Sequence, residues 1–216
     1  MMRICRFFSS SFSCSAFLFI LACFPMLAHA GLGTSEHNHQ IPPASDFPQS
    51  KSRTIKGGPF QLVTHTGQTV TEKSFLGNYL LIYFGYTYCP EVCPIDLAVI
   101  SDAMDLLGEQ GSKVQPLFIT FDPDRDSVER LASYVTHFHP RLIGLTGTKE
   151  QTLAAATHYG VDVSSTYKAE VAGSAYSMNH SAFTYLVGPK GDLRVMFRDR
   201  TPASLMVSTI KKALDH

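Results

Sequence analysis

The sequence has no tryptophan, and it has no excess of charge of either sign, since 18 Lys and Arg balance 18 Asp and Glu among 216 residues. Balanced charge argues against a protein that binds nucleic acid or another polyanion through a basic surface. No internal repeat or low-complexity tract appears. Because 44% of the residues are apolar, the chain can bury a full core. Its length suggests one domain with an N-terminal appendage.

Cysteine is also scarce. Three of the five cysteines lie in the N-terminal segment, and Cys89 and Cys93 are the only two in the rest of the chain. One pair is too few for a disulfide framework, and a domain of this size does not need one. We therefore expect the pair to be functional, and a purely structural disulfide is the alternative.

Residues 1–30 have the parts of an export signal. Arg3 and Arg6 give a basic start, residues 12–27 are free of charge, and Ala28-His29-Ala30 is a possible cleavage site. An uncleaved membrane anchor is the alternative, although an apolar stretch of about 16 residues is short for the roughly 20 that a bilayer needs. A lipoprotein signal ending at Cys23 is a poorer fit. The sequence predicts a periplasmic domain, or one anchored in the inner membrane and facing the periplasm.

Residues 31–56 are rich in Gly, Ser, Pro and polar residues without an apolar period, which predicts a linker. His37 and His39 lie here and have no assigned role; loose metal binding is the alternative to two solvated side chains. The folded domain is expected to comprise residues 57–216.

The pattern within that domain alternates strands with helices. Strands are expected at 60–63, 69–71, 79–84, 114–121, 142–145, 182–187 and 193–197, and helices at 95–107, 128–138, 149–159 and 202–214. Residues 161–179 are expected to be an irregular excursion. This order predicts an α/β fold with a sheet covered on both faces. It is the thioredoxin-like arrangement with an added N-terminal β-hairpin.

Cys89 and Cys93 fall between the strand at 79–84 and the helix at 95–107. A helix N-terminus stabilises a thiolate, so both thiols are expected to be more acidic than a free cysteine. Redox enzymes on this fold usually separate their cysteines by two residues, whereas three lie between these. Such a pair can form a disulfide, or it can hold one soft ion such as copper(I) or copper(II) with a third ligand.

His180 is the best candidate for the third ligand. It precedes the strand expected at 182–187, where a thioredoxin-like fold usually has a cis-proline packed against the redox pair. The other histidines are expected in the signal, the linker, a distant turn, helix ends or the terminus.

Three stretches resemble the SCO/SenC family of copper-binding proteins. They are Gly85-Tyr86-Thr87-Tyr88-Cys89-Pro90-Glu91-Val92-Cys93-Pro94, Phe121-Asp122-Pro123-Asp124-Arg125-Asp126 and Asn179-His180-Ser181-Ala182-Phe183. The opening Gly58-Pro59-Phe60-Gln61-Leu62 is similar as well. The resemblance covers about residues 57–214.

The resemblance implies a thioredoxin-like domain that binds copper through Cys89, Cys93 and His180. It implies a role in supplying copper to, or reducing the thiols of, the dinuclear copper site of a cytochrome c oxidase subunit. An upstream copper donor is a further possible partner. Asp122 matches a family aspartate near the site, and the alternative is a turn residue that bonds its own backbone.

Two functions therefore compete. A copper metallochaperone uses the three ligands, whereas a thiol–disulfide oxidoreductase uses Cys89 as the attacking thiolate and Cys93 as the resolving one. A peroxidase is a weaker form of the second reading. Whether the protein is an enzyme stays open at this point, and the copper reading is favoured.

Overall fold

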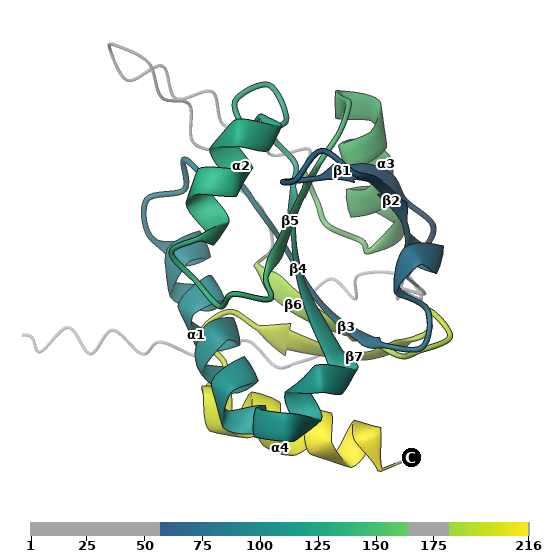
Figure 1. The fold of residues 1–216 in the computed structure, drawn as a ribbon, viewed down its shortest axis with the longest axis vertical. Coiled ribbons are helices and arrows are strands. Elements are labelled where there is room, and N and C mark those ends of the chain that lie inside the picture. Colours follow the sequence, from purple (N-terminus) through teal and green to yellow (C-terminus); the bar gives the residue numbers. More distant parts are fainter. Residues whose placement is uncertain (1–56, 164–181, 216) are drawn as a thin grey trace, which may run out of the picture. The chain divides into compact units, whose positions relative to one another are not determined.

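One mixed sheet organises the part of the chain that the structure, a computed structural model, describes: residues 57–163 and 182–215. Its strands run in the order β2-β1-β5-β4-β3-β6-β7 (Figure 1). The strands are β1 (Gln61–Thr64), β2 (Thr69–Thr71), β3 (Tyr79–Gly85), β4 (Val114–Thr120), β5 (Ile143–Thr146), β6 (Phe183–Val187) and β7 (Leu193–Arg198). The α-helices are α1 (Val92–Leu107), α2 (Val128–Val135), α3 (Lys149–His158) and α4 (Ala203–Leu214).

β3 is an inner strand of the sheet, and all seven of its residues are buried. It pairs parallel with β4 on one side and antiparallel with β6 on the other. A strand covered on both faces needs a continuous apolar run, and this is what Tyr79–Phe84 supplies. Because β3 ends at Gly85, the chain leaves the interior of the sheet just before the two cysteines.

The helices follow from the crossovers between parallel strands. α1 connects β3 to β4, and α2 connects β4 to β5, which pairs parallel with β4. Both right-handed crossovers step across the sheet in the same direction, so the two helices lie on the same face. α4 packs against α1, and α3 lies on the other side of the strands, near β1 (Figure 1).

Several boundaries differ from the sequence prediction. β1 spans Gln61–Thr64 instead of 60–63, and it pairs antiparallel with β2, with Leu62 opposite Val70. α2 ends at Val135 instead of Phe138, because the His137 and Phe138 N–H groups each bond a carbonyl three residues earlier. Two short 3₁₀ helices, η2 (Glu72–Phe75) and η3 (Gly108–Lys113), were not predicted. The predicted signal, its linker and most of the predicted excursion lie outside the described residues.

Candidate metal centre

The two cysteines lie on the loop and first turn that join β3 to α1. Cys89 is partly buried on the loop, and Cys93 is fully buried in the first turn of the helix. The Cys93 backbone N–H donates to the Cys89 sulfur at 3.4 Å. This N–H has no carbonyl acceptor within the helix, because it belongs to the first turn. The helix terminus therefore offers Cys89 the stabilisation predicted from its position in the sequence.

The prediction of two acidic thiols was wrong for Cys93. A hydrogen bond with the Cys89 side chain and burial away from water raise the pKa of the Cys93 thiol. The Tyr86 backbone and the Tyr83 hydroxyl oppose this effect but do not reverse it. The sequence showed that Cys93 lies near the start of a helix, but it did not show that the Cys93 side chain is buried. A soft metal ion displaces such a proton when it binds.

Gly85 provides the space that the Cys93 sulfur occupies. A Cβ at this position would lie 2.8 Å from the Cys93 sulfur, 2.8 Å from the Phe118 ring and 3.1 Å from the Tyr83 ring. All of these neighbours are buried. The glycine that ends β3 is thus a packing requirement of the buried thiol.

A buried carboxylate fixes the loop that carries Cys89. Asp126 is fully buried, and its Oδ2 accepts the Thr87 backbone N–H at 3.0 Å while its Oδ1 accepts the Thr87 hydroxyl at 2.6 Å. The Thr120 hydroxyl donates to Oδ2 at 2.6 Å. Sequence reasoning missed this role. Thr87 and Asp126 both stood in the motifs that resemble the family, but their pairing across 39 residues could not be read from either motif.

Asp122 lies near the same loop and is also buried. Its carboxylate forms an ion pair with Arg125, and its carbonyl accepts the Arg125 and Asp126 N–H groups. Arg125 in turn lies 4.8 Å from the ring centre of Tyr88, which is half-exposed beside Cys89. The Asp122 side chain therefore holds a cation against the cysteine loop, in addition to shaping its own turn.

A third buried carboxylate, Asp96 in α1, contacts the turn that precedes α4. Asp96 is buried, and its Oδ1 accepts the Arg200 backbone N–H at 2.8 Å. The Arg200 guanidinium pairs with Glu91, between the two cysteines, at 3.2 Å. Arg200 has a φ of 55°, which is unusual for a residue with a side chain. The turn between β7 and α4 thus packs against the cysteine motif.

His180 lies outside the described residues, so its distance from the two sulfurs is not part of the structure. The strand that follows His180 in the sequence, β6, does lie within the described residues. β6 begins at Phe183 and runs antiparallel to β3, with Thr184 opposite Tyr83. The chain therefore enters β6 at the end of the sheet from which it leaves β3 toward Cys89.

Within residues 57–163 and 182–215, no group of three or more His, Cys, Asp and Glu side chains is arranged to hold a metal ion. Within the same ranges no helix has the length and apolar character that crossing a bilayer requires. Within the described residues, Cys89 and Cys93 therefore lie together as a pair and not in a larger group of this kind.

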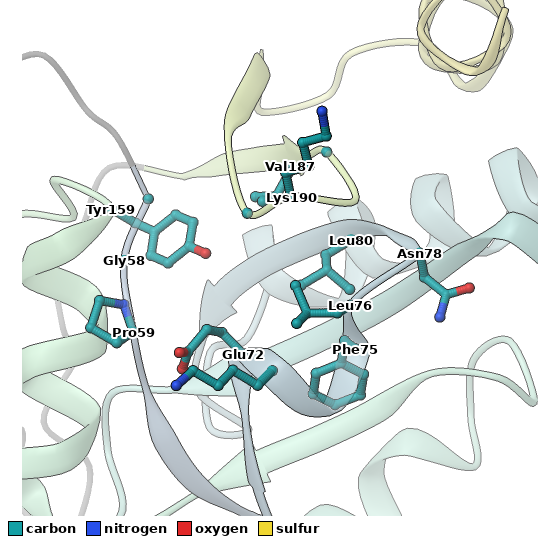
Figure 2. A pocket seen from close by; sticks show the side chains of 14 residues that line it. Gly58, Pro59, Glu72, Phe75, Leu76, Asn78, Leu80, Tyr159, Val187 and Lys190 are labelled. Carbon is teal, nitrogen blue, oxygen red and sulfur yellow. The ribbon is translucent and has the colours of Figure 1, made fainter.

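A pocket of about 320 Å³ lies at the other end of β3 (Figure 2). Leu80 lines it from the start of that strand, and Val187 lines it from the end of β6. A strand of this length spans roughly 20 Å, so the pocket is well separated from the cysteines. We call its surroundings the pocket end and residues Gly85–Cys93 the cysteine end. The other lining residues include Glu72, Phe75, Leu76, Asn78, Tyr159 and Lys190.

The fold and the cysteine end together define a thioredoxin-like α/β protein with a thiol pair at the start of its first long helix. Residues 48–215 match the family described as SCO1/SenC. The chain belongs to the SCO1/SenC family. The matched range begins within the stretch predicted as a linker.

Individual relatives agree with this assignment. The chain is 43% identical to human "Protein SCO1 homolog, mitochondrial" over 142 residues, which cover 65% of this chain and 46% of that protein. It is 44% identical to Rhodobacter capsulatus "Protein SenC" over 148 residues, covering 68% of this chain and 65% of the relative. The chain thus spans about half to two thirds of the length of these relatives.

Solved structures show the same fold. Arabidopsis thaliana ScoI, crystallised with copper bound, superposes with a TM-score of 0.67 at 35% identity, covering 74% of this chain and 98% of that one. The thioredoxin-like α/β prediction is confirmed by this likeness.

Proposed function

We propose that this protein is a copper metallochaperone that binds copper through Cys89, Cys93 and His180. The observation that carries the proposal is the contact between two thiols at the first turn of α1, one partly buried and one fully buried. Thiolate and imidazole ligands favour copper over hard cations. The copper-bound Arabidopsis relative supports copper as the cargo.

The topology supports His180 as the third ligand. Phe183 lies three residues after His180 in the sequence and begins a strand that enters the sheet at the cysteine end. An imidazole supplied there adds a neutral ligand to two thiolates. Copper binding then removes protons from the thiols, including the buried Cys93 thiol, which is hard to ionise without the metal.

We further propose the cytochrome c oxidase subunit with the dinuclear copper site as the recipient, following the role of the family. An upstream copper donor is the matching supplier. Export of the domain to the periplasm, free or tethered by residues 1–30, completes the proposal. The segment that carries this signal lies outside the described residues.

Copper transfer tests this function directly. The reduced, copper(I)-loaded chain is mixed with the metal-free copper-binding domain of the oxidase subunit, and copper in each protein is measured after separation. We expect wild type to transfer copper and His180→Ala to arrive poorly loaded. Failure of wild type to load, or of loaded wild type to transfer, would overturn the proposal.

A thiol–disulfide oxidoreductase is the second candidate, and one observation favours it. The Cys93 N–H that donates to the Cys89 sulfur stabilises a thiolate at the more accessible cysteine, as an attacking thiol requires. This function predicts reduction of a disulfide in the partner that survives His180→Ala and is abolished by Cys89→Ser. A copper chaperone without this activity shows no turnover in any of these forms.

A further inference from the structure

Asp126 is a buried carboxylate that contacts the cysteine end through Thr87, although it lies far from Cys89 in the sequence. It is fully buried and accepts three hydrogen bonds, two from Thr87 and one from Thr120. Burial raises the pKa of Asp126, and the bonds from the two threonines lower it. An isolated carboxylate in such a place is costly, so these bonds are what makes its burial tolerable.

The bonds to Thr87 act on the turn that presents Cys89. The Cys89 N–H donates to the Tyr86 carbonyl at 3.2 Å, which closes a turn with Thr87 and Tyr88 at its centre. Asp126 holds both the N–H and the hydroxyl of Thr87, and therefore fixes the first central residue of the turn in position and orientation.

The same carboxylate ties this turn to the sheet. Thr120 is the last residue of β4, and its hydroxyl donates to Asp126 while accepting the Asp122 N–H at 3.0 Å. From the solvent side, the Arg130 Nε donates to the Thr87 hydroxyl at 3.1 Å, and the guanidinium lies 4.9 Å from the Tyr88 ring centre. Asp126 and Arg130, both from residues 120–130, thus contact the turn from the interior and from the solvent side.

We propose that Asp126 is a positioning residue for the thiol pair: it holds the Tyr86–Cys89 turn so that the Cys89 sulfur stays against the first turn of α1. Asp126 acts through Thr87 and does not bind the metal. The inference rests on the proposed copper function for its consequence, which is a preorganised pair of sulfur ligands. Preorganisation increases affinity because less ordering is required on binding.

The geometry requires a carboxylate at this position. Three donors point at two oxygens, and an ionised carboxylate can accept all of them. An asparagine has one acceptor oxygen, and its NH₂ group faces a donor. Asp126→Asn therefore leaves at least one buried donor unsatisfied, and this variant is the strongest test if it folds.

Thr87→Val is the milder test, and the chain offers a matched control. Thr87 and Thr146 are both 6% exposed, and the hydroxyl of each bonds Asp126. The Thr87 hydroxyl donates to the carboxylate, whereas the Thr146 hydroxyl donates to the backbone carbonyl at 2.9 Å. Valine at either position removes one buried hydroxyl, but only Thr87→Val removes a bond between the cysteine turn and Asp126, leaving the backbone N–H bond alone to hold it. Thr87→Ser keeps the hydroxyl and should restore wild-type behaviour.

Two measurements on the full chain test whether Asp126 positions the Tyr86–Cys89 turn. The first is amide hydrogen exchange of Cys89 by NMR in the reduced, copper-free protein. The second is copper(I) affinity, by competition with bathocuproine disulfonate. We expect Thr87→Val to speed Cys89 exchange and weaken copper(I) binding by at least tenfold, with Asp126→Asn stronger in both, and Thr146→Val near wild type.

Equal exchange at Cys89 in Thr87→Val and Thr146→Val would overturn the positioning role. So would a loss of copper affinity that follows global stability in both variants. Wild type that binds no copper(I) would instead contradict the proposed function, and the exchange comparison would still decide whether Asp126 positions the turn.

Discussion

At the cysteine end of β3, the buried carboxylates of Asp126 and Asp96 accept backbone N–H groups and fix the chain around the thiols, whereas at the pocket end apolar and polar side chains, among them Leu80 and Lys190, line a cavity. Both ends belong to the same strand and share its core. The thiols thus lie at the end where buried carboxylates accept hydrogen bonds, away from the cavity. If the proposed site is correct, a change in the lining of the cavity should leave copper binding unchanged.

Leu80→Ala should have the largest effect on stability. Leu80 is buried where β3 begins and lines the pocket. Removing its side chain costs buried apolar contact and enlarges the hollow, which predicts a loss of about 2–4 kcal/mol. Urea unfolding measures this loss. Copper(I) affinity of the folded variant should stay at the wild-type value, and a tenfold decrease would contradict the separation of the two ends.

Gly85→Ala should have a smaller effect on stability and a specific effect on the site. The added methyl group overpacks the core against the Cys93 sulfur, at a cost of about 1–3 kcal/mol. Because it displaces that sulfur, we expect copper(I) affinity to fall at least tenfold, measured by chelator competition.

Gly144→Ala is the control for this substitution. Its Cβ would lie 3.0 Å from Val135 and 3.4 Å from Leu131, under α2 and away from the cysteines. It should destabilise the fold by crowding without changing copper affinity. If both alanine variants reduce affinity alike, Gly85 has no special relation to the thiol.

Asp96→Asn tests the charge of the buried Asp96 carboxylate next to the cysteine end. Burial is the main cause that raises the pKa of Asp96 in the folded state. Folding therefore favours the protonated carboxyl group. The stability that this form contributes is present below the usual Asp range and is lost as pH rises through the folded-state pKa. Asparagine keeps an acceptor for the Arg200 N–H and carries no charge. We expect the variant to gain stability relative to wild type as pH rises above the usual Asp range. Denaturant unfolding at several pH values checks this, and a pH-independent difference would refute it.

His139→Gln should have the smallest effect, and it concerns a site away from the thiols. Burial lowers the pKa of His139, whose Nδ1 accepts the Arg141 N–H at 3.2 Å. The stability from the neutral ring is present above the usual His pKa and is lost as pH falls through the lowered value. Protonation removes one hydrogen bond, worth about 1 kcal/mol. Thermal unfolding of wild type should show this loss as pH falls below the usual His pKa, and the variant should not.

Much of the fold could be predicted because its signals are local. The apolar run at Tyr79–Phe84 predicted β3, and the turn residues after it predicted a helix near the cysteines. The helix begins at Val92, earlier than the predicted residue 95, so that Cys93 lies within its first turn. Side-chain burial is not local, which is why the raised pKa of Cys93 was missed. The bonds from Thr87 to Asp126 were missed for the same reason, since any of the three aspartates of the motif could have turned inward. The sequence prediction of His180 remains untested, because it lies outside the described residues.

The most direct test of the copper proposal is a titration of the reduced chain with copper(I) under anaerobic conditions. Cys5, Cys14 and Cys23 are first replaced by Ser, so that only two thiols remain. We expect one copper(I) per chain, with binding strongly weakened in each of Cys89→Ala, Cys93→Ala and His180→Ala. Unchanged affinity in His180→Ala would leave a two-thiol site and contradict the three-ligand account.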